Sequence, residues 1–168
     1  MPYTETEEDL VFDFSDVLNK NEVRFDTKRL RDRTSIQPVD FLAEYEACYR
    51  FIEVKDPDQP GAKNPQAYER EFREGKGVRD LAGKFRDSFF LFSLQGREPK
   101  RVEYVVLLSM ARLEAAFLVT KTDELKKSIP WNHPSMVNSP LSTCVILNFA
   151  QWQKQFGQNS VWRASDYT

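Results

Sequence analysis

Three charged residues, Asp40, Glu53 and Lys55, stand at a spacing that could form a catalytic metal site. Asp40 lies in the segment 39–45, and the other two lie in the segment 48–55. A pair of carboxylates suits hard divalent cations such as Mg²⁺. A neighbouring ammonium group could stabilise negative charge that develops on a substrate. We therefore interpret these residues as a set that could hydrolyse phosphodiester bonds.

The two segments that carry these residues predict an antiparallel pair of strands. Both are rich in aromatic and β-branched residues, which favour strands. The link at Glu46 and Ala47 is short, so the strands are expected to be neighbours in a hairpin. A turn centred between those two residues puts Asp40 opposite Glu53, with Lys55 on the same face because strand side chains alternate. A slip of one residue would separate the carboxylates.

Apolar residues on both sides of this hairpin predict that other elements cover both of its faces. Four are expected on one face: Val39, Phe41, Ile52 and Val54. Two are expected on the other: Leu42 and Phe51. Charged groups on such strands are costly to bury unless they are paired or bind a metal, which supports a functional interpretation.

The rest of the chain predicts a strand cluster followed by alternating helices and strands. The segments 1–9 and 62–77 are expected to be a loose acidic lead and a polar excursion over the surface. Further elements are expected in this order: a helix at 10–20 (or a strand, from the alternation of Val11, Asp13 and Ser15), a strand at 21–26, a helix at 78–94, a strand at 101–110, a helix at 111–129, a strand at 141–150 and a helix at 151–156. This order predicts an α/β fold whose central mixed β-sheet is flanked by helices on both faces.

Length and charge narrow the classes of protein to consider. A chain of 168 residues suits one domain, and its net charge of −2 gives no overall basic signature for nucleic acid. Positive charge would have to be local, as in the segment 28–33, which is either a solvated loop or a phosphate-contacting loop. No apolar run approaches the roughly 20 residues of a membrane span, and the acidic start is unlike a signal peptide. We expect a cytoplasmic protein with no membrane partner.

Asp40 followed by Glu53-Val54-Lys55, and then by a helix and a strand, resembles the PD-(D/E)XK nuclease superfamily, which includes restriction endonucleases. Pro38-Val39-Asp40 departs from the usual Pro-Asp by one residue. The chain is also similar to a bacterial group within that superfamily. The resemblance predicts one nuclease-like domain over 1–168, with a core at about 10–110 and a C-terminal strand and helices at 111–168.

The resemblance implies a restriction endonuclease-like core, in which three antiparallel strands join a fourth through a helix and the site lies at a fork in the sheet. Asp40, Glu53 and the Val54 carbonyl would hold Mg²⁺ or Mn²⁺. Lys55 would position the attacking water or stabilise the developing charge.

Two further positions follow from the same resemblance. An acidic residue from the first helix would join the site, and Asp16 is our choice, with Asp13 and Glu8 behind it. A basic residue on the helix after the motif would also join, and Lys84 fits, with Arg86 as a weaker choice. Plainer interpretations stay open: Asp16 as a cap or surface charge, Lys84 on a solvated helix face, and the motif itself as a structural ion-pair cluster.

Two functions follow as hypotheses. The first is a metal-dependent nuclease that acts on nucleic acid, with DNA expected ahead of RNA. The second is a catalytically silent nuclease-fold subunit that binds a protein partner in a bacterial defence or toxin system. A homodimer is possible in either case, since many members of the superfamily dimerise to cut two strands.

Overall fold

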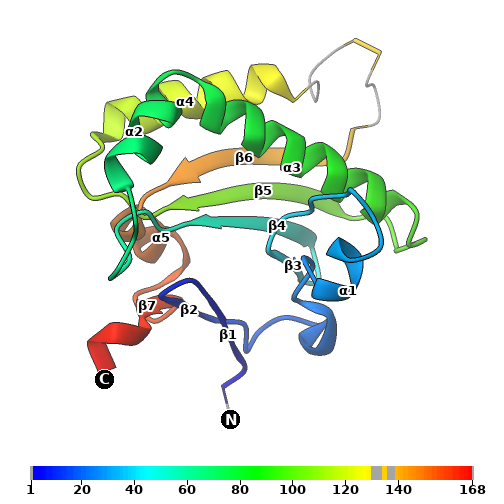
Figure 1. Ribbon diagram of the computed structural model, residues 1–168. Helices are drawn as coiled ribbons and strands as arrows, with labels where there is room; N and C mark the ends of the chain where they lie inside the picture. Colours follow the sequence, from blue (N-terminus) through cyan, green and yellow to red (C-terminus); the bar gives the residue numbers. More distant parts are fainter. Residues whose placement is uncertain (1, 130–133, 136–138, 168) are drawn as a thin grey trace.

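The computed structural model describes residues 2–129, 134–135 and 139–167 and contains two β-sheets. The main sheet has four strands in the order β3–β4–β5–β6 (Figure 1). Strand β3 (Phe41–Glu44) runs antiparallel to β4 (Cys48–Lys55), whereas β5 (Arg101–Leu108) and β6 (Leu141–Leu147) run parallel to β4. The predicted α/β fold with a mixed sheet is therefore confirmed.

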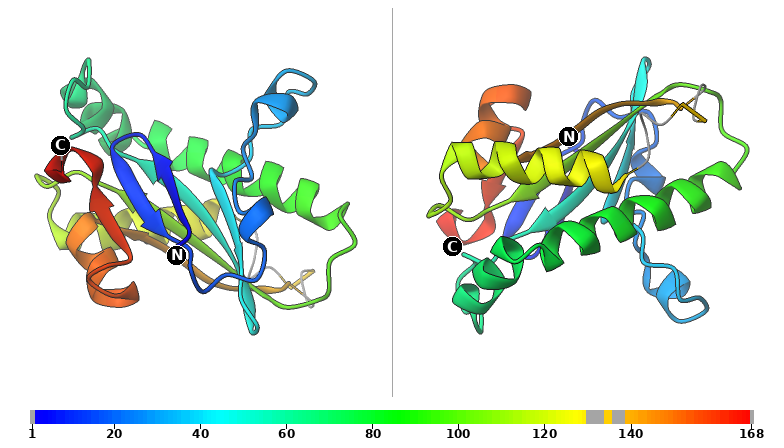
Figure 2. Two further views of the ribbon diagram at one scale, coloured as in Figure 1. Left: turned by 90° about the horizontal axis from the view of Figure 1, so that it is seen from below. Right: turned by 90° about the horizontal axis from the view of Figure 1, so that it is seen from above.

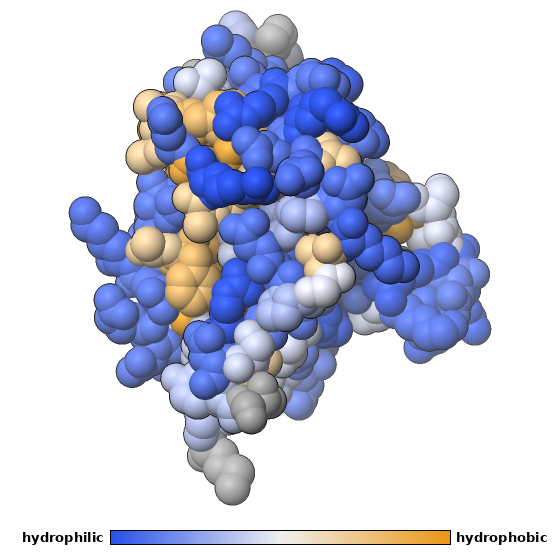
Figure 3. Space-filling model, turned by 60° about the vertical axis from the view of Figure 1, so that its left-hand side comes forward, coloured by the Kyte–Doolittle hydropathy of each residue, from blue (hydrophilic) through white to orange (hydrophobic). Residues whose placement is uncertain are grey.

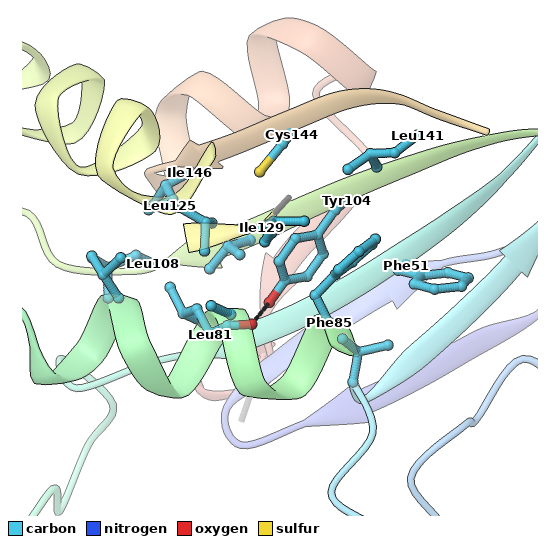
Figure 4. Close-up of a cluster of buried hydrophobic side chains, with 14 of the residues drawn as sticks. Phe51, Leu81, Phe85, Tyr104, Leu108, Leu125, Ile129, Leu141, Cys144 and Ile146 are labelled. Atoms are coloured by element: carbon cyan, nitrogen blue, oxygen red, sulfur yellow. Dashed lines mark hydrogen bonds between the residues drawn. The ribbon is translucent and has the colours of Figure 1, made fainter. Parts of the chain in front are cut away.

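Three helices cover one face of the main sheet: α2 (Pro65–Arg73), α3 (Lys76–Ser93) and α4 (Ala115–Ser128) (Figure 1). The apolar stripe predicted at 78–94 lies on α3, where Val78, Leu81 and Phe85 are buried against the sheet. The hydroxyl of Tyr104 on β5 donates a hydrogen bond of 2.8 Å to the carbonyl of Leu81 (Figure 4). This contact fixes α3 across β5 and β4.

The opposite face is covered by a second, three-stranded sheet and by α5 (Phe149–Phe156). Its strands are β1 (Thr4–Glu7), β2 (Leu10–Asp13) and β7 (Val161–Arg163), which join the two ends of the chain (Figure 2). Helices on both faces are thus found, but a small sheet does much of the covering on this side. In the part of the chain that the structure describes, no helix is long and apolar enough to cross a membrane.

Several predicted elements near the N-terminus differ from the structure. The helix expected at 10–20 is wrong, and the strand alternative is right, because Leu10 and Phe12 are buried while their neighbours are half-exposed. The segment 1–9 is not a loose lead, since Thr4–Glu7 pairs with Leu10–Asp13. The strand expected at 21–26 is reduced to one bridge, Arg24 to Phe41, after a 3₁₀ helix, η1, at Lys20–Glu22.

Two other short elements were also not predicted. Helix α1 (Lys28–Arg31) lies in the charged segment, and the chain ends in a 3₁₀ helix, η2 (Ala164–Tyr167). The polar excursion expected at 62–77 is wrong, because α2 forms there with Asn64 as its cap and Pro65 in its first turn. The three antiparallel strands that the resemblance implied are not found within the described residues of the main sheet, which pair antiparallel only between β3 and β4.

The register of the predicted hairpin is confirmed for the paired residues. Phe41 pairs with Ile52, and Leu42 pairs with Phe51. Phe41 and Ile52 face the small sheet, whereas Leu42 and Phe51 face α3, as alternation requires. Val39 was expected beside Phe41 but packs on the α3 side, because β3 begins only at Phe41 and the alternation does not extend past its first residue.

Candidate active site

The β3–β4 hairpin opens at the end where Asp40 lies. Asp40 directly precedes β3, and its Oδ2 accepts a hydrogen bond of 2.7 Å from the backbone N–H of Val54. A side-chain carboxylate therefore replaces the ladder partner that Val54 lacks at this point. Because a strand residue directs its N–H and C=O toward the same neighbour, the Val54 carbonyl lies on the edge of β4 that faces Asp40.

Glu53 is the most buried charged residue of this site, with no exposed surface. Its Oε1 lies 2.7 Å from the Nζ of Lys55 and 3.3 Å from the Nζ of Lys84. Its Oε2 has no hydrogen-bond partner among the residues that the structure describes. A buried carboxylate with two cations on one oxygen and none on the other has room in its coordination for a further partner.

Helix α3 positions both Lys84 and the segment that leads into Asp40. The Nζ of Lys84 donates to the carbonyl of Pro38 at 3.2 Å. The N–H of Val39 donates to the Ser88 hydroxyl at 2.8 Å, and that hydroxyl donates to the Lys84 carbonyl at 2.7 Å. The predicted basic residue on this helix therefore lies beside Glu53, and the same helical turn anchors the approach to Asp40.

The charges of this group shift the protonation of its members. Burial, reinforced by the negative charge of Glu53, raises the pKa of Asp40 to about 8. Burial acts to lower the pKa of Lys55, but attraction to Glu53 outweighs it and the pKa of Lys55 is raised. Lys55 is thus a cation at neutral pH, whereas the raised pKa keeps the Asp40 carboxyl group protonated there when no cation is bound.

A cleft of about 600 Å³ opens over this group between α2, α3 and the turn of the β1–β2 hairpin. Its lining carries both charges: three cations, Lys55, Arg79 and Lys84, and four acidic residues, Glu8, Glu71, Asp80 and Asp87. In Figure 3 the end of the molecule where β4, β5 and β6 terminate comes forward, and hydrophilic residues dominate that face. Lys55 and Lys84, which contact Glu53, therefore line the cleft, whereas Asp40 and Glu53 are buried behind its lining.

The third choice for an N-terminal acidic residue, Glu8, lies at this cleft. Its Oε2 accepts a hydrogen bond of 2.6 Å from the N–H of Asp56, the residue after Lys55. Burial raises the pKa of Glu8. Its backbone φ is +56°, which is strained for a residue other than glycine and is a common cost at functional positions.

The first choice, Asp16, is not brought to the site. It is exposed in a turn and lines a different hollow with Tyr45 and Arg50, at the closed end of the β3–β4 hairpin. Asp13 lines the same hollow, where its carboxylate accepts hydrogen bonds from Ser15. Both were chosen on the expectation of a first helix, which the structure replaces with a strand and a turn.

Two features of the site were not foreseen from the sequence. Tyr68 lines the cleft from α2, a helix that was expected to be irregular, and burial raises the pKa of its hydroxyl. Asp56 is buried and makes a two-pronged ion pair with Arg163 of β7, at 2.8 and 3.0 Å. The only available signal was the position of Asp56 directly after a buried strand. His133, the single histidine, lies outside the described residues.

Comparisons with family models, with curated proteins and with solved structures find no match for this chain. Functional conclusions therefore depend on the chemistry of the site itself.

Proposed function

We propose that this chain is a metal-dependent nuclease that hydrolyses phosphodiester bonds of DNA, with a site of the PD-(D/E)XK kind. The observation that carries the proposal is the convergence of Asp40, Glu53, Lys55 and Lys84 below one polar cleft. Two carboxyl groups that could hold a cation, together with two ammonium groups, suit the attack on an anionic phosphate.

The residues of the site fit a hard divalent cation. Asp40 and Glu53 are two buried carboxyl groups, and a bound cation would offset the burial and the charge of Glu53 that raise the pKa of Asp40. The Oε2 of Glu53, which has no hydrogen-bond partner among the described residues, has the character of an unfilled ligand position. Within the described residues no group of three or more acidic, His or Cys side chains gathers as a metal site. Mg²⁺ needs no such group, because it is commonly held by one or two carboxylates with water and substrate oxygens. Asp40, Glu53 and the Val54 carbonyl would hold it.

The protein's own residues supply the rest of the proposed chemistry. When bound, Mg²⁺ or Mn²⁺ would polarise the scissile phosphate. Lys55 stays protonated beside Glu53, so it acts as an electrostatic stabiliser of the developing charge rather than as a general base. Lys84 is fixed between the Pro38 carbonyl and Glu53 and adds a second cation at the mouth of the cleft.

Incubation with supercoiled plasmid and linear DNA in Mn²⁺ or Mg²⁺ tests this proposal. We expect Lys55→Ala to lower the rate by about 10²–10³, as the loss of one preorganised charge-stabilising group does elsewhere. Asp40→Ala should abolish cleavage. Asp16→Ala is the matched control, because this exposed carboxylate lies at the other end of the hairpin and should leave the rate unchanged.

Circular dichroism of each variant separates loss of activity from loss of fold. Cleavage that persists at the wild-type rate in folded Asp40→Ala or Lys55→Ala protein would refute the assignment. Absence of cleavage by the wild-type protein, with both cations and with DNA and RNA substrates, would refute it as well.

One observation favours the second function, a silent subunit that binds a protein partner. Lys55 and Lys84 already neutralise Glu53, so the ion pairs alone could account for its burial. Titration calorimetry with Mn²⁺ distinguishes the two. Metal binding that Asp40→Ala removes supports the nuclease, whereas no heat of binding together with a stable co-purifying protein supports the silent subunit. A homodimer is compatible with both.

A further inference from the structure

A basic arm, which we define as residues 27–37, projects from the body of the protein beside the site. It contains α1, and in both views of Figure 2 this segment stands out from the rest of the fold. All its residues are exposed except Leu30 and Ile36, which are half-buried. The segment 28–33 holds four cations and one carboxylate, a net charge of +3, whereas the whole chain carries −2, so the remainder carries −5.

Part of this charge is not neutralised within the fold. Lys28 pairs with Asp32, and Arg31 pairs with Asp26 at 2.9 Å. Arg29 and Arg33 form no ion pair with any residue in the described ranges. Like charges held this close together repel one another, so an arm of this composition is better explained by an anionic partner than by stability.

The basic arm leads into the candidate active site through a second cleft. That cleft has a volume of about 280 Å³, and Arg31 and Thr34 of the arm line it. Gln37 and Lys84 line both this cleft and the cleft over Glu53. The two clefts are therefore adjacent, and an extended polyanion could follow one route from the arm past Lys84 to Lys55.

Both ends of the basic arm are fixed to the site. Before the arm, the N–H groups of Phe25 and Asp26 donate to the Asp40 carbonyl at 2.9 and 3.4 Å. At its far end, the N–H of Gln37 donates to the Asp87 carboxylate on α3 at 2.8 Å. The arm is thus attached to the same two elements that hold Asp40 and Lys84, which sets its position relative to the reacting phosphate.

We propose that the basic arm binds the phosphate backbone of the DNA strand beside the scissile bond, with Arg29 and Arg33 contacting phosphates. This inference rests on the proposed nuclease function for its choice of partner. Arginine contacts to phosphate carry no sequence information, so the arm sets affinity and alignment rather than a cutting sequence.

Salt-dependent binding of a fluorescent 30-base-pair DNA duplex in EDTA tests the arm without cleavage. The variant is Arg29→Gln/Arg33→Gln. Each lost phosphate contact should lower the slope of log K against log salt by about 0.9, so we expect a decrease of about 1.8. The control is Lys127→Gln/Lys154→Gln, which removes the same charge from exposed positions on α4 and α5 and should keep the wild-type slope.

A second measurement separates this inference from the proposed function. Hydrolysis of bis(p-nitrophenyl) phosphate with Mn²⁺ should be unchanged in the arm variant, since this substrate is too small to reach the arm, and should be lost in Asp40→Ala. If the arm variant binds DNA as tightly as the wild-type protein and with the same salt dependence, the arm assignment is overturned. Salt-dependent DNA binding that the arm variant weakens, without hydrolysis of any substrate, upholds the arm and refutes the nuclease.

Discussion

The proximity of three of the candidate residues, Asp40, Glu53 and Lys55, could be predicted from the sequence because it depends on local geometry. Alternation along one strand fixes the shared face of Glu53 and Lys55, and a short hairpin link fixes the partner of that strand. Lys84 was chosen from the family resemblance, and its place off the apolar stripe of a helix is compatible with its position beside Glu53. Asp16 was preferred to Glu8, yet Glu8 is the one that lies at the cleft, because its position depends on how β1 and β2 pair, which no local pattern encodes.

At the same residue scale, the raised pKa of Asp40 predicts how stability changes with pH. The value of about 8 exceeds the ordinary 3.8, so between these pH values the folded chain binds more protons than the unfolded chain. The contribution of Asp40 to the free energy of unfolding therefore falls as pH rises. Asp40→Asn should be more stable than wild type by several kcal/mol at pH 8, since each pKa unit corresponds to about 1.4 kcal/mol.

Urea denaturation of both proteins at pH 5 and pH 8 measures this difference, which should be much smaller at the lower pH. Asp16→Asn serves as the control, because this carboxylate is exposed and should leave the curve unchanged. Saturating Mn²⁺ should reduce the gain of Asp40→Asn at pH 8, since a bound cation offsets the repulsion between the carboxylates. A gain of the same size at both pH values would contradict the assigned titration.

At the scale of elements, strongly patterned segments were predictable and polar or short ones were not. The long apolar stripe of α3 predicts a helix, and the continuous apolar runs of β4 and β5 predict buried strands. Helix α2 was not predicted, because its composition is polar and only Phe72 in it is fully buried. Its position becomes clear only from the tertiary contact with α3, where it forms one wall of the cleft.

The close approach of α2 and α3 requires a glycine at position 77. A Cβ atom there would lie 2.2 Å from the ring of Phe72, which is buried between the two helices, so the ring or a helix would have to shift. Gly77→Ala should therefore destabilise the protein by about 1–3 kcal/mol, as overpacking of a core does. Gly83→Ala on the same helix is the matched control, because the nearest atom to its Cβ is the mobile end of Arg86 at 3.8 Å.

In the control, replacing a helical glycine with alanine should raise stability by up to about 1 kcal/mol. Chemical denaturation of the two variants at one pH measures both effects. Equal stability of Gly77→Ala and Gly83→Ala would show that Phe72 yields and that the contact does not hold α2 in place.

At the scale of the whole molecule, the two ends of the chain meet behind the site. Strand β7 adds to the β1–β2 hairpin, and this small sheet closes the core on the face of the main sheet opposite α3. A three-residue strand near the C-terminus has too little pattern to be predicted from the sequence, and its partner lies about 150 residues away. The position of Arg163 was therefore beyond sequence reasoning.

Arg163 connects the small sheet to β4, the strand that carries Glu53 and Lys55. Its guanidinium holds both oxygens of the buried Asp56 carboxylate and also reaches the Ser109 hydroxyl at 2.8 Å, at the ends of β4 and β5. Arg163→Met leaves Asp56 buried without its cation and should cost about 3–5 kcal/mol. Asp56→Asn alone should also destabilise, because it leaves the guanidinium half-paired.

The double variant Arg163→Met/Asp56→Asn should be more stable than the sum of the two single effects predicts, because the buried Asp56 charge is removed together with its cation, and only the outer ion pair of Arg163 with Asp9 is lost. A double-mutant cycle from urea unfolding measures this coupling, and simple additivity would show that the ion pair does not join the termini to β4. DNA-cleavage rates of the same four proteins test whether this ion pair also affects the candidate active site. Asp56 follows Lys55 directly in the sequence. Loss of its ion pair with Arg163 should therefore lower the cleavage rate of the single variants even under conditions in which they are still folded.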